Sequence, residues 1–339
     1  MLTYQWLDRI GPDVEQDLSG LVVRAATFDA EMGFSKIVLA DPPETAHLPR
    51  PEPRTYHLLA RMSRRTCGPS LVPAQALVAY VRADVSGVDE SATLSFVVGP
   101  ESRSLGVATL LFELLEQDTA SGRGWSVTGA THLQAWAHGN HPAAQRMARR
   151  FGARAAHRRW RLCRPLAGPG SDVPRSPEPD GLTVRRLSER EQCLIEEVGD
   201  LVASVPNRVP SSQRRPGPDV HSADFFLAIR EPGVLVGVLA TSGHPGSPHP
   251  GAGSIRTLAV RSGQDGGAIE RALLEKGIAH LRAGGAHTID VYVDPADKRM
   301  VHTCRSLGFG HDQTDVCYAW PRIRSVPAGK SSTTARCLR

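Results

Sequence analysis

The residues best suited to chemistry in this chain lie in one loop, between an expected strand at 92–98 and an expected helix at 107–117. The loop carries the run Arg103-Ser104-Leu105-Gly106-Val107-Ala108. A glycine allows the backbone to approach a ligand closely, and a helix that starts here leaves its first N–H groups without acceptors. These N–H groups and the helix dipole favour a bound anion, phosphate above all. From the loop alone, an ordinary strand-loop-helix connection is the alternative.

No other arrangement of side chains matches a catalytic or metal-binding spacing. Six cysteines are scattered without the spacing of zinc ligands, and no Ser-His-Asp or Cys-His order presents itself. His244 and His249 lie in a stretch rich in Pro and Gly, which is typical of a flexible loop. We therefore expect no metal site.

Composition bounds the class of protein. The chain has 339 residues, of which 40% are hydrophobic and 22% charged, as expected for two ordinary globular domains. It lacks an apolar run long enough to span a membrane, and its first residues lack the pattern of a secretory signal, so we expect a cytoplasmic protein with no membrane contact. The net charge of +5 comes mostly from arginine without interleaved aromatic residues, so we expect no nucleic-acid partner.

The pattern of elements occurs twice. The first copy predicts strands at 76–82, 92–98, 132–137 and 154–163 and helices at 107–117 and 142–151; the second predicts strands at 234–242, 254–260, 288–293 and 312–320 and helices at 268–283 and 297–307. Val260 follows Val98 by 162 positions, and Gly267 follows Gly106 by 161. A period of this length is one domain, so we expect two copies of one α/β (α+β) domain.

The boundaries follow from this repeat. We predict a first domain at 1–165, a Pro/Gly/Ser linker at 166–180, a second domain at 181–321 and a disordered basic tail at 322–339. A helix at 14–27 opens the first domain, and a strand at 182–187 followed by a helix to about 201 opens the second. Residues 50–73 and 207–220 show no readable pattern.

The loop and its strand resemble the GNAT family of acyl-CoA N-acyltransferases. Val98, Pro100, Arg103, Gly106 and Ala108 carry this resemblance. It implies a mixed, mostly antiparallel sheet flanked by helices in each domain, acetyl-CoA as co-substrate, and a loop that holds the pyrophosphate of coenzyme A. The implied cofactor-binding residues are Phe96, Val97, Val98, Arg103, Ser104, Leu105, Gly106, Val107, Ala108 and Thr109 in the first domain, and Leu258, Ala259, Val260, Gln264, Gly266, Gly267 and Asp297 in the second.

Several segments narrow the resemblance to a tandem GNAT family, the mycothiol synthases. They are Trp136-Ala137-His138-Gly139, the junction around 164–182, Tyr292-Val293-Asp294, and the run 303–309. The resemblance implies transfer of acetyl from acetyl-CoA to the cysteinyl amine of a cysteinyl-glucosaminyl-inositol. It also implies an actinobacterial origin, which the arginine-rich composition suits.

Some positions depart from the family pattern. The catalytic glutamate and tyrosine of the family fall at Ser254 and Cys304 here, and one of its polar substrate contacts falls at Lys36, which is not a carboxylate. Tyr292 matches another substrate contact of the family, with a half-buried strand tyrosine as the alternative. Cys304 could donate a proton to the leaving thiolate or pack as a small hydrophobe. The second loop lacks the usual arginines, and its Asp265 opposes phosphate binding.

These departures leave three functions open. The first is the mycothiol-synthase-like N-acetyltransferase, and the second is a related enzyme that acts on another small-molecule amine. The third is a non-catalytic tandem module that binds acetyl-CoA. For all three we expect a monomer.

Four further candidate site residues have simpler structural interpretations. These are His138 and His141 as solvated loop histidines, Glu90 as a loop carboxylate, and Asp297 as a helix N-cap.

Overall fold

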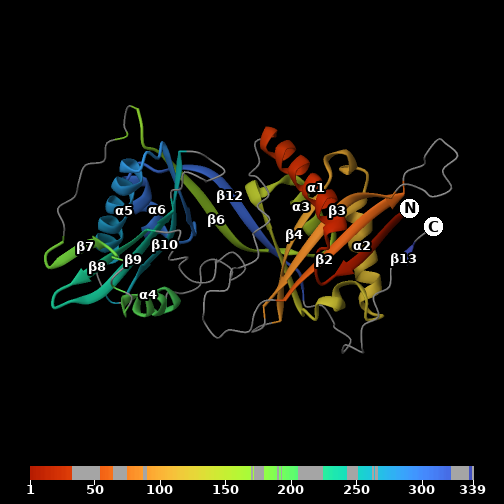
Figure 1. The fold of residues 1–339 in the computed structure, drawn as a ribbon, viewed down its shortest axis with the longest axis horizontal. Helices are drawn as coiled ribbons and strands as arrows, with labels where there is room; N and C mark the ends of the chain where they lie inside the picture. The colour runs from red at the N-terminus through yellow and green to blue at the C-terminus, as the bar shows by residue number, and fades with distance from the viewer. Residues whose placement is uncertain are drawn as a thin grey trace. The chain divides into compact units, whose positions relative to one another are not determined.

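The computed structural model describes residues 1–32, 54–63, 75–86, 90–168, 171, 179–188, 191, 193–204, 224–242, 251–261, 263, 266–321 and 336–337. These residues form two compact units. Among them, unit 1 comprises residues 1–157 and those from 315 onward, and unit 2 comprises residues 158–314. Each unit contains one copy of the repeated pattern (Figure 1).

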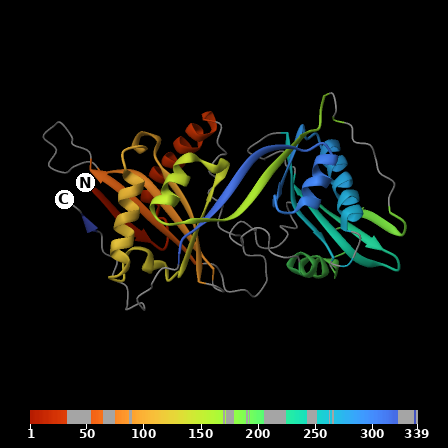
Figure 2. The same ribbon diagram turned by 180° about the vertical axis from the view of Figure 1, so that it is seen from behind.

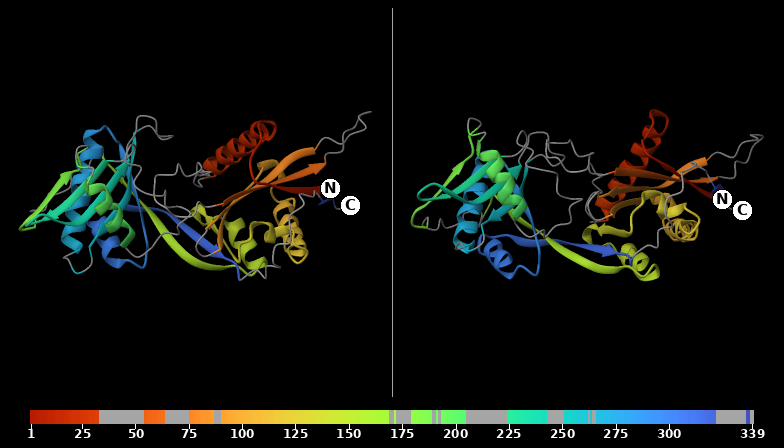
Figure 3. Two further views of the ribbon diagram at one scale, coloured as in Figure 1. Left: turned by 60° about the horizontal axis from the view of Figure 1, so that its bottom comes forward. Right: turned by 90° about the horizontal axis from the view of Figure 1, so that it is seen from below.

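Unit 1 is built on a mostly antiparallel sheet. Its elements are β1 (Leu2–Leu7), α1 (Pro12–Glu31), β2 (Arg54–Ser63), β3 (Gln75–Val85), β4 (Ser91–Val98), the 3₁₀ turn η1 (Pro100–Ser102), α2 (Val107–Thr119), η2 (Gly124–Thr128), β5 (His132–Ala137), η3 (His138–Asn140), α3 (Pro142–Arg150), the first part of β6 (Arg154–Pro165) and β13 (Arg336–Cys337). The strand order is β13-β1-β2-β3-β4-β5-β12. One apolar cluster packs α1 on the sheet and another packs α2, so the two helices cover opposite faces (Figure 3).

Unit 2 repeats this plan. Its elements are β7 (Leu182–Arg186), α4 (Cys193–Ser204), β8 (Asp224–Arg230), β9 (Val234–Ser242), β10 (Ala252–Val260), α5 (Gly266–Ala283), β11 (Thr288–Val293), α6 (Lys298–Ser306) and most of β12 (Gly310–Ala319). The strand order is β6-β11-β10-β9-β8-β7. A large cluster packs α5 and α6 on one face, and a smaller one packs α4 on the other (Figure 2).

The last strand of each sheet comes from the other half of the sequence. β6 leaves unit 1 at residue 157, and its residues 160–165 pair with β11 in unit 2. β12 leaves unit 2 at residue 314, and its residues 316–319 pair with β5 in unit 1. The compact units therefore differ from the predicted sequential boundary at 165, because the chain crosses between the units within two strands.

Both sheets open at the same place. β4 and β5 run parallel and pair only from Ser91–His132 to Leu94–Ala135, although β4 continues to Val98 against β3. In unit 2, β10 and β11 pair only from Ala252–Thr288 to Ile255–Val291. β10 then continues against β9 past a bulge at Arg256. Beyond these rungs one edge of β4 and one edge of β10 have no strand partner among the described residues.

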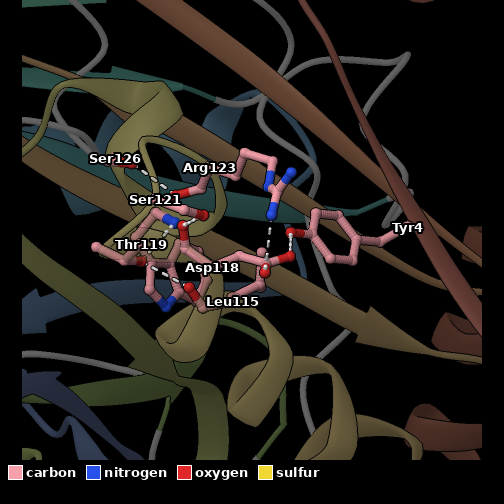
Figure 4. A network of polar contacts seen from close by, with 8 residues as sticks. Tyr4, Leu115, Asp118, Thr119, Ser121, Arg123 and Ser126 are labelled. Carbon is pink, nitrogen blue, oxygen red and sulfur yellow. Dashed lines mark hydrogen bonds and ion pairs between the residues drawn. The ribbon is translucent and has the colours of Figure 1, made fainter. Parts of the chain in front are cut away.

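A buried polar contact joins β1 to the end of α2 (Figure 4). The Tyr4 hydroxyl donates to Asp118 Oδ2 at 2.5 Å, and the Asp118 side chain is 2% exposed. Arg123 approaches the other carboxylate oxygen at 3.8 Å. Burial, followed by the hydrogen bond to Asp118, raises the pKa of Tyr4 far above its ordinary value. This contact ties the first strand to the helix that follows the candidate anion loop.

The predicted fold class and repeat are confirmed. Strands β5, β9 and β11 begin and end at the predicted residues. The sequence did not reveal β1, β2 or β8, which complete the outer part of each sheet. Of the predicted tail at 322–339, the structure describes only β13, whose backbone pairs with β1.

Candidate active site

The predicted anion loop of unit 1 presents its backbone N–H groups to solvent. Gly106 is the N-cap of α2 with a left-handed backbone (φ 77°), and Ser104 also has a positive φ of 62°. In this part of the described chain, no protein acceptor is recorded for the N–H groups of residues 104–109. A Cβ added at Gly106 would meet nothing within 4 Å, so the space in front of the loop is open. An anion the size of a diphosphate fits this arrangement.

Arg103 holds the loop in place from behind. Its Nε donates to the Val98 carbonyl at 3.1 Å, and its guanidinium forms a two-point ion pair with Asp29 of α1, with Nη2 to Oδ2 at 3.2 Å. The guanidinium also lies over the Phe28 ring, 5.2 Å from its centroid. Because Asp29 neutralises much of its charge, Arg103 acts here by positioning the loop.

His141 stands beside this ion pair. Its Nδ1 accepts the N–H of Ala143 at 3.1 Å, so it caps α3. Burial lowers the pKa of His141, and the charge of Arg103 acts in the same direction. The charge of Asp29 opposes this shift in part. His138, by contrast, pairs with the buried Asp315 at 3.1 Å. Both histidines thus have structural partners, and Glu90 is exposed.

The end of β4 offers its open edge next to the loop. Phe96 and Val98 pack toward α2, with the Phe96 ring 5.4 Å from Phe112, whereas Val97 packs toward α1. The side chains are therefore taken up by the two cores. What β4 presents along its free edge is backbone, which is suited to an extended chain carrying amide groups.

The corresponding loop of unit 2 differs in detail. α5 begins at Gly266, two residues before the predicted start, so Gly266 and Gly267 form its first turn. The left-handed glycine of this loop is Gly263 (φ 82°). Ile269 is fully buried against Gly237 of β9, so its bulk points into the core. Gln264 and Asp265 lie outside the described residues.

A cation that no sequence motif indicates, Arg299, lies at the start of α5. A Cβ added at Gly266 would stand 3.1 Å from Nη1 and Nη2 of Arg299, so this guanidinium covers the first turn. Arg299 also donates to Glu270 Oε1 at 2.7 Å and is more than half exposed. In sequence it looks like an ordinary exposed arginine of α6, and only the packing of α6 on α5 places it here.

The strand before this loop matches its counterpart. Leu258 and Val260 pack toward α5, and Ala259 packs toward α4. Asp297 is the N-cap of α6, and its carboxylate accepts the Met300 N–H at 3.3 Å. This contact is the N-cap named above as the alternative to a cofactor contact at Asp297.

Ser254 and Asp290 face each other across the last rungs before β10 and β11 separate. They are direct neighbours in the parallel pairing, and the Ser254 hydroxyl hydrogen-bonds the Asp290 carboxylate. Burial raises the pKa of Asp290, while that hydrogen bond and the charges of Arg161 and Arg256 act in the opposite direction. Tyr292 lies two residues further along the same face and is 37% exposed, with Arg159 4.5 Å over its ring.

Cys304 lies in the core of unit 2 beneath α5. Its side chain is fully buried. Burial, with smaller effects of Glu270 and Asp297, raises the pKa of Cys304 to about 12. Such a thiol is a weaker acid than the leaving thiol, which favours the alternative of a packing residue. Lys36, the other predicted substrate contact, lies outside the described residues.

Among the described residues, no group of three or more His, Cys, Asp or Glu side chains is arranged to hold a metal ion. None of the helices in the same residues combines the length and apolar character needed to cross a membrane.

Known proteins share both the sequence and the fold. The profile of the Acetyltransferase (GNAT) family matches residues 200–309. The mycothiol acetyltransferase of Paenarthrobacter aurescens is 31% identical over 251 residues, covering 71% of this chain and 74% of that protein. That of Salinispora tropica is 28% identical over 321 residues, covering 92% of this chain and 94% of that protein.

Solved structures agree on the fold. A tandem GNAT protein from the clavulanic acid biosynthesis pathway matches with a TM-score of 0.63 at 16% identity, covering 98% of this chain and 100% of that one. A GCN5-related N-acetyltransferase from Sphaerobacter thermophilus matches with a TM-score of 0.61 at 19% identity, covering 94% of this chain and 97% of that one. The chain therefore belongs to the GNAT acetyltransferase family, as an N-acetyltransferase with tandem GNAT domains and sequence relatives among the mycothiol acetyltransferases.

Proposed function

We propose that this N-acetyltransferase transfers the acetyl group of acetyl-CoA to the cysteinyl α-amine of a cysteinyl-glucosaminyl-inositol. The observation that carries the proposal is the open loop before α2, whose N–H groups at 104–109 have no recorded protein acceptor, beside the free edge of β4. The mycothiol acetyltransferases that resemble the chain over most of its length support the choice of acceptor.

In this proposal the loop of unit 1 holds the diphosphate of coenzyme A. The N–H groups of residues 104–109 donate to its oxygens, and the pantetheine arm lies along Phe96, Val97 and Val98. The loop of unit 2 has the same place in its repeat and holds a second acetyl-CoA in this proposal, the acetyl donor for an acceptor bound at Tyr292. Arg299, which is paired with Glu270, covers the first turn of α5 there. An acetyl thioester supplies an electrophilic carbonyl carbon and a thiolate leaving group.

The acceptor fits this chemistry. A cysteinyl α-amine has an ordinary pKa of about 7.7–8.0, so roughly a tenth of it is neutral at pH 7. Holding that amine against a thioester supplies much of the rate, since well-oriented reactants reach effective molarities of about 10⁵ M or more. Tyr292, exposed on the face opposite α5, is the proposed substrate contact on this side of unit 2. Cytoplasmic location, a monomeric state and the lack of a nucleic-acid partner complete the proposal.

Incubation of the chain with acetyl-CoA and cysteinyl-glucosaminyl-inositol tests this function. Mass spectrometry should show one added acetyl group on the acceptor, together with an equal amount of free coenzyme A. Glucosaminyl-inositol, which lacks the cysteinyl amine, is the matched control and should gain no acetyl. Acetylation of other amines alone would indicate a related enzyme with another acceptor, and tight coenzyme A binding without any acceptor-dependent thiol release would indicate a non-catalytic module.

A further inference from the structure

The two repeats carry different side chains on one equivalent rung. In unit 2 that rung is Ser254 opposite Asp290, and in unit 1 it is Thr93 opposite Gln134. Gln134 Nε2 donates to Thr93 Oγ1 at 2.8 Å, so the pair in unit 1 is neutral and satisfied. A carboxylate therefore occurs at this rung in only one of the two repeats.

The rung lies at the entrance to the opening between β10 and β11. One further pair, Ile255 with Val291, follows it before the strands separate. Ile255 and Val291 belong to the core under α5, so Ser254 and Asp290, which alternate with them, lie on the opposite face. The carboxylate therefore stands one rung from the opening, on the two strands that border it.

Ser254, the member of this rung on β10, offers no basic group. Its hydroxyl cannot remove a proton from an amine at neutral pH, but it hydrogen-bonds a carboxylate on the neighbouring strand. The required functional group is present one strand away.

We propose that Asp290 is the general base of unit 2, and that Ser254 orients it. This inference rests on the proposed function and adds to it the residue that accepts the proton. The carboxylate takes one proton from the acceptor ammonium, and the freed nitrogen attacks the thioester carbon. The N–C bond forms and the C–S bond breaks, and the second nitrogen proton passes to the departing thiolate. Asp290 then returns its proton to solvent, which closes the balance at one proton released per turnover.

The surroundings of Asp290 suit this task. A carboxyl with an ordinary pKa is a weak base toward an ammonium group with a pKa of about 7.7–8.0. Any rise in the pKa of Asp290 brings the two pKa values closer and makes the proton transfer more favourable. Burial provides that rise. The groups that face Asp290 are Arg161 and Cys163 on β6 and Arg256 on β10, and Arg161 is itself paired with Asp312 at 2.6 Å.

Substitution of this one carboxylate tests the assignment. Asp290→Asn preserves shape and should lower kcat/KM for the acceptor by about 10²-fold or more, the usual effect of losing a general base. The KM for acetyl-CoA should change little, and the acid limb of the pH–rate profile should move up to the pKa of the acceptor amine, about 7.7–8.0, because only the neutral amine then reacts. Gln134→Leu is the matched control at the equivalent rung of unit 1 and should leave the rate within about twofold.

A rescue variant separates catalysis from folding. In the double variant with Ser254→Glu and Asp290→Asn, the carboxylate moves one strand across the same rung, and we expect recovery of at least about tenfold over Asp290→Asn. An Asp290→Asn enzyme that retains the wild-type rate and pH profile would overturn the assignment while leaving the N-acetyltransferase function intact. So would a folded double variant that shows no recovery. If the wild-type chain transfers no acetyl to any amine, the proposed function and this assignment fail together.

Discussion

At the residue scale, catalysis and stability place opposite demands on Asp290, because a base must be charged whereas a buried carboxyl is more stable when neutral. Its burial favours the protonated form in the folded protein, so the charged form that a base requires is disfavoured there. In sequence it is one polar residue in the alternating strand 288–293, and nothing marks it as chemical. Only the register against Ser254 reveals it, and register across a parallel pair depends on tertiary packing. Arg299 could not be predicted either, because only the packing of α6 on α5 brings it to the start of α5.

The stability of Asp290→Asn should therefore move in the opposite direction from its activity. Because the folded pKa of Asp290 is raised, its contribution to stability is fully present below the unfolded pKa and is lost as pH rises through the folded pKa. At pH 7 the neutral asparagine should give the variant a larger free energy of unfolding than wild type. This difference should shrink as the pH falls toward about 4, where Asp290 becomes protonated in both the folded and the unfolded state. Urea unfolding at both pH values measures this. A variant less stable than wild type at pH 7 would mean that the charge of Asp290 is structural.

At the scale of elements, the hydrophobic periodicity of the sequence was enough to predict a helix or strand wherever the segment is half-buried and bounded by turns. It identified β4, α2, β5, β9 and β11, and the anion loop followed from the strand and helix on either side of it. β2 lies within the polar, proline-rich segment 50–73, and β8 follows the similar segment 207–220, so the sequence around them showed no periodic pattern. β1 was also missed. The start of α5 was placed two residues late, since the glycines at 266 and 267 read as loop.

The contact between β1 and α2 gives a test at this scale. Tyr4→Phe removes the donor to Asp118 and leaves a buried carboxylate with one partner fewer, so it should destabilise the protein by about 1–3 kcal/mol. Tyr318→Phe is the control, because the Tyr318 hydroxyl makes a longer bond of 3.3 Å to Asn140. Thermal unfolding followed by circular dichroism compares the two. Equal losses of stability in the two variants would show that the hydrogen bond from Tyr4 to Asp118 stabilises the protein no more than the longer bond of Tyr318 does.

For the whole molecule, the two repeats have diverged in complementary directions. Unit 1 keeps a loop of open N–H groups and a neutral rung at Thr93–Gln134. In unit 2, α5 begins at Gly266 with its first turn covered by Arg299, and a carboxylate stands at the same rung. The repeat itself was readable from the sequence because glycines and apolar runs recur at about 160 positions. The exchange of the last strands was not, because strand pairing between distant segments leaves no local pattern.

The most direct test concerns the loop before α2 and uses two variants that differ by one charge. Asparagine and aspartate both tolerate the left-handed conformation at position 106, and a Cβ there meets open space, so Gly106→Asn and Gly106→Asp should both fold. Calorimetric titration with coenzyme A should show weakened binding at the wild-type stoichiometry for Gly106→Asn, because its neutral side chain enters the space in front of the loop. For Gly106→Asp, one fewer molecule of coenzyme A should bind per chain, because a carboxylate then faces the diphosphate. Equal affinity and stoichiometry for Gly106→Asp and wild type would contradict the placement of the diphosphate at this loop.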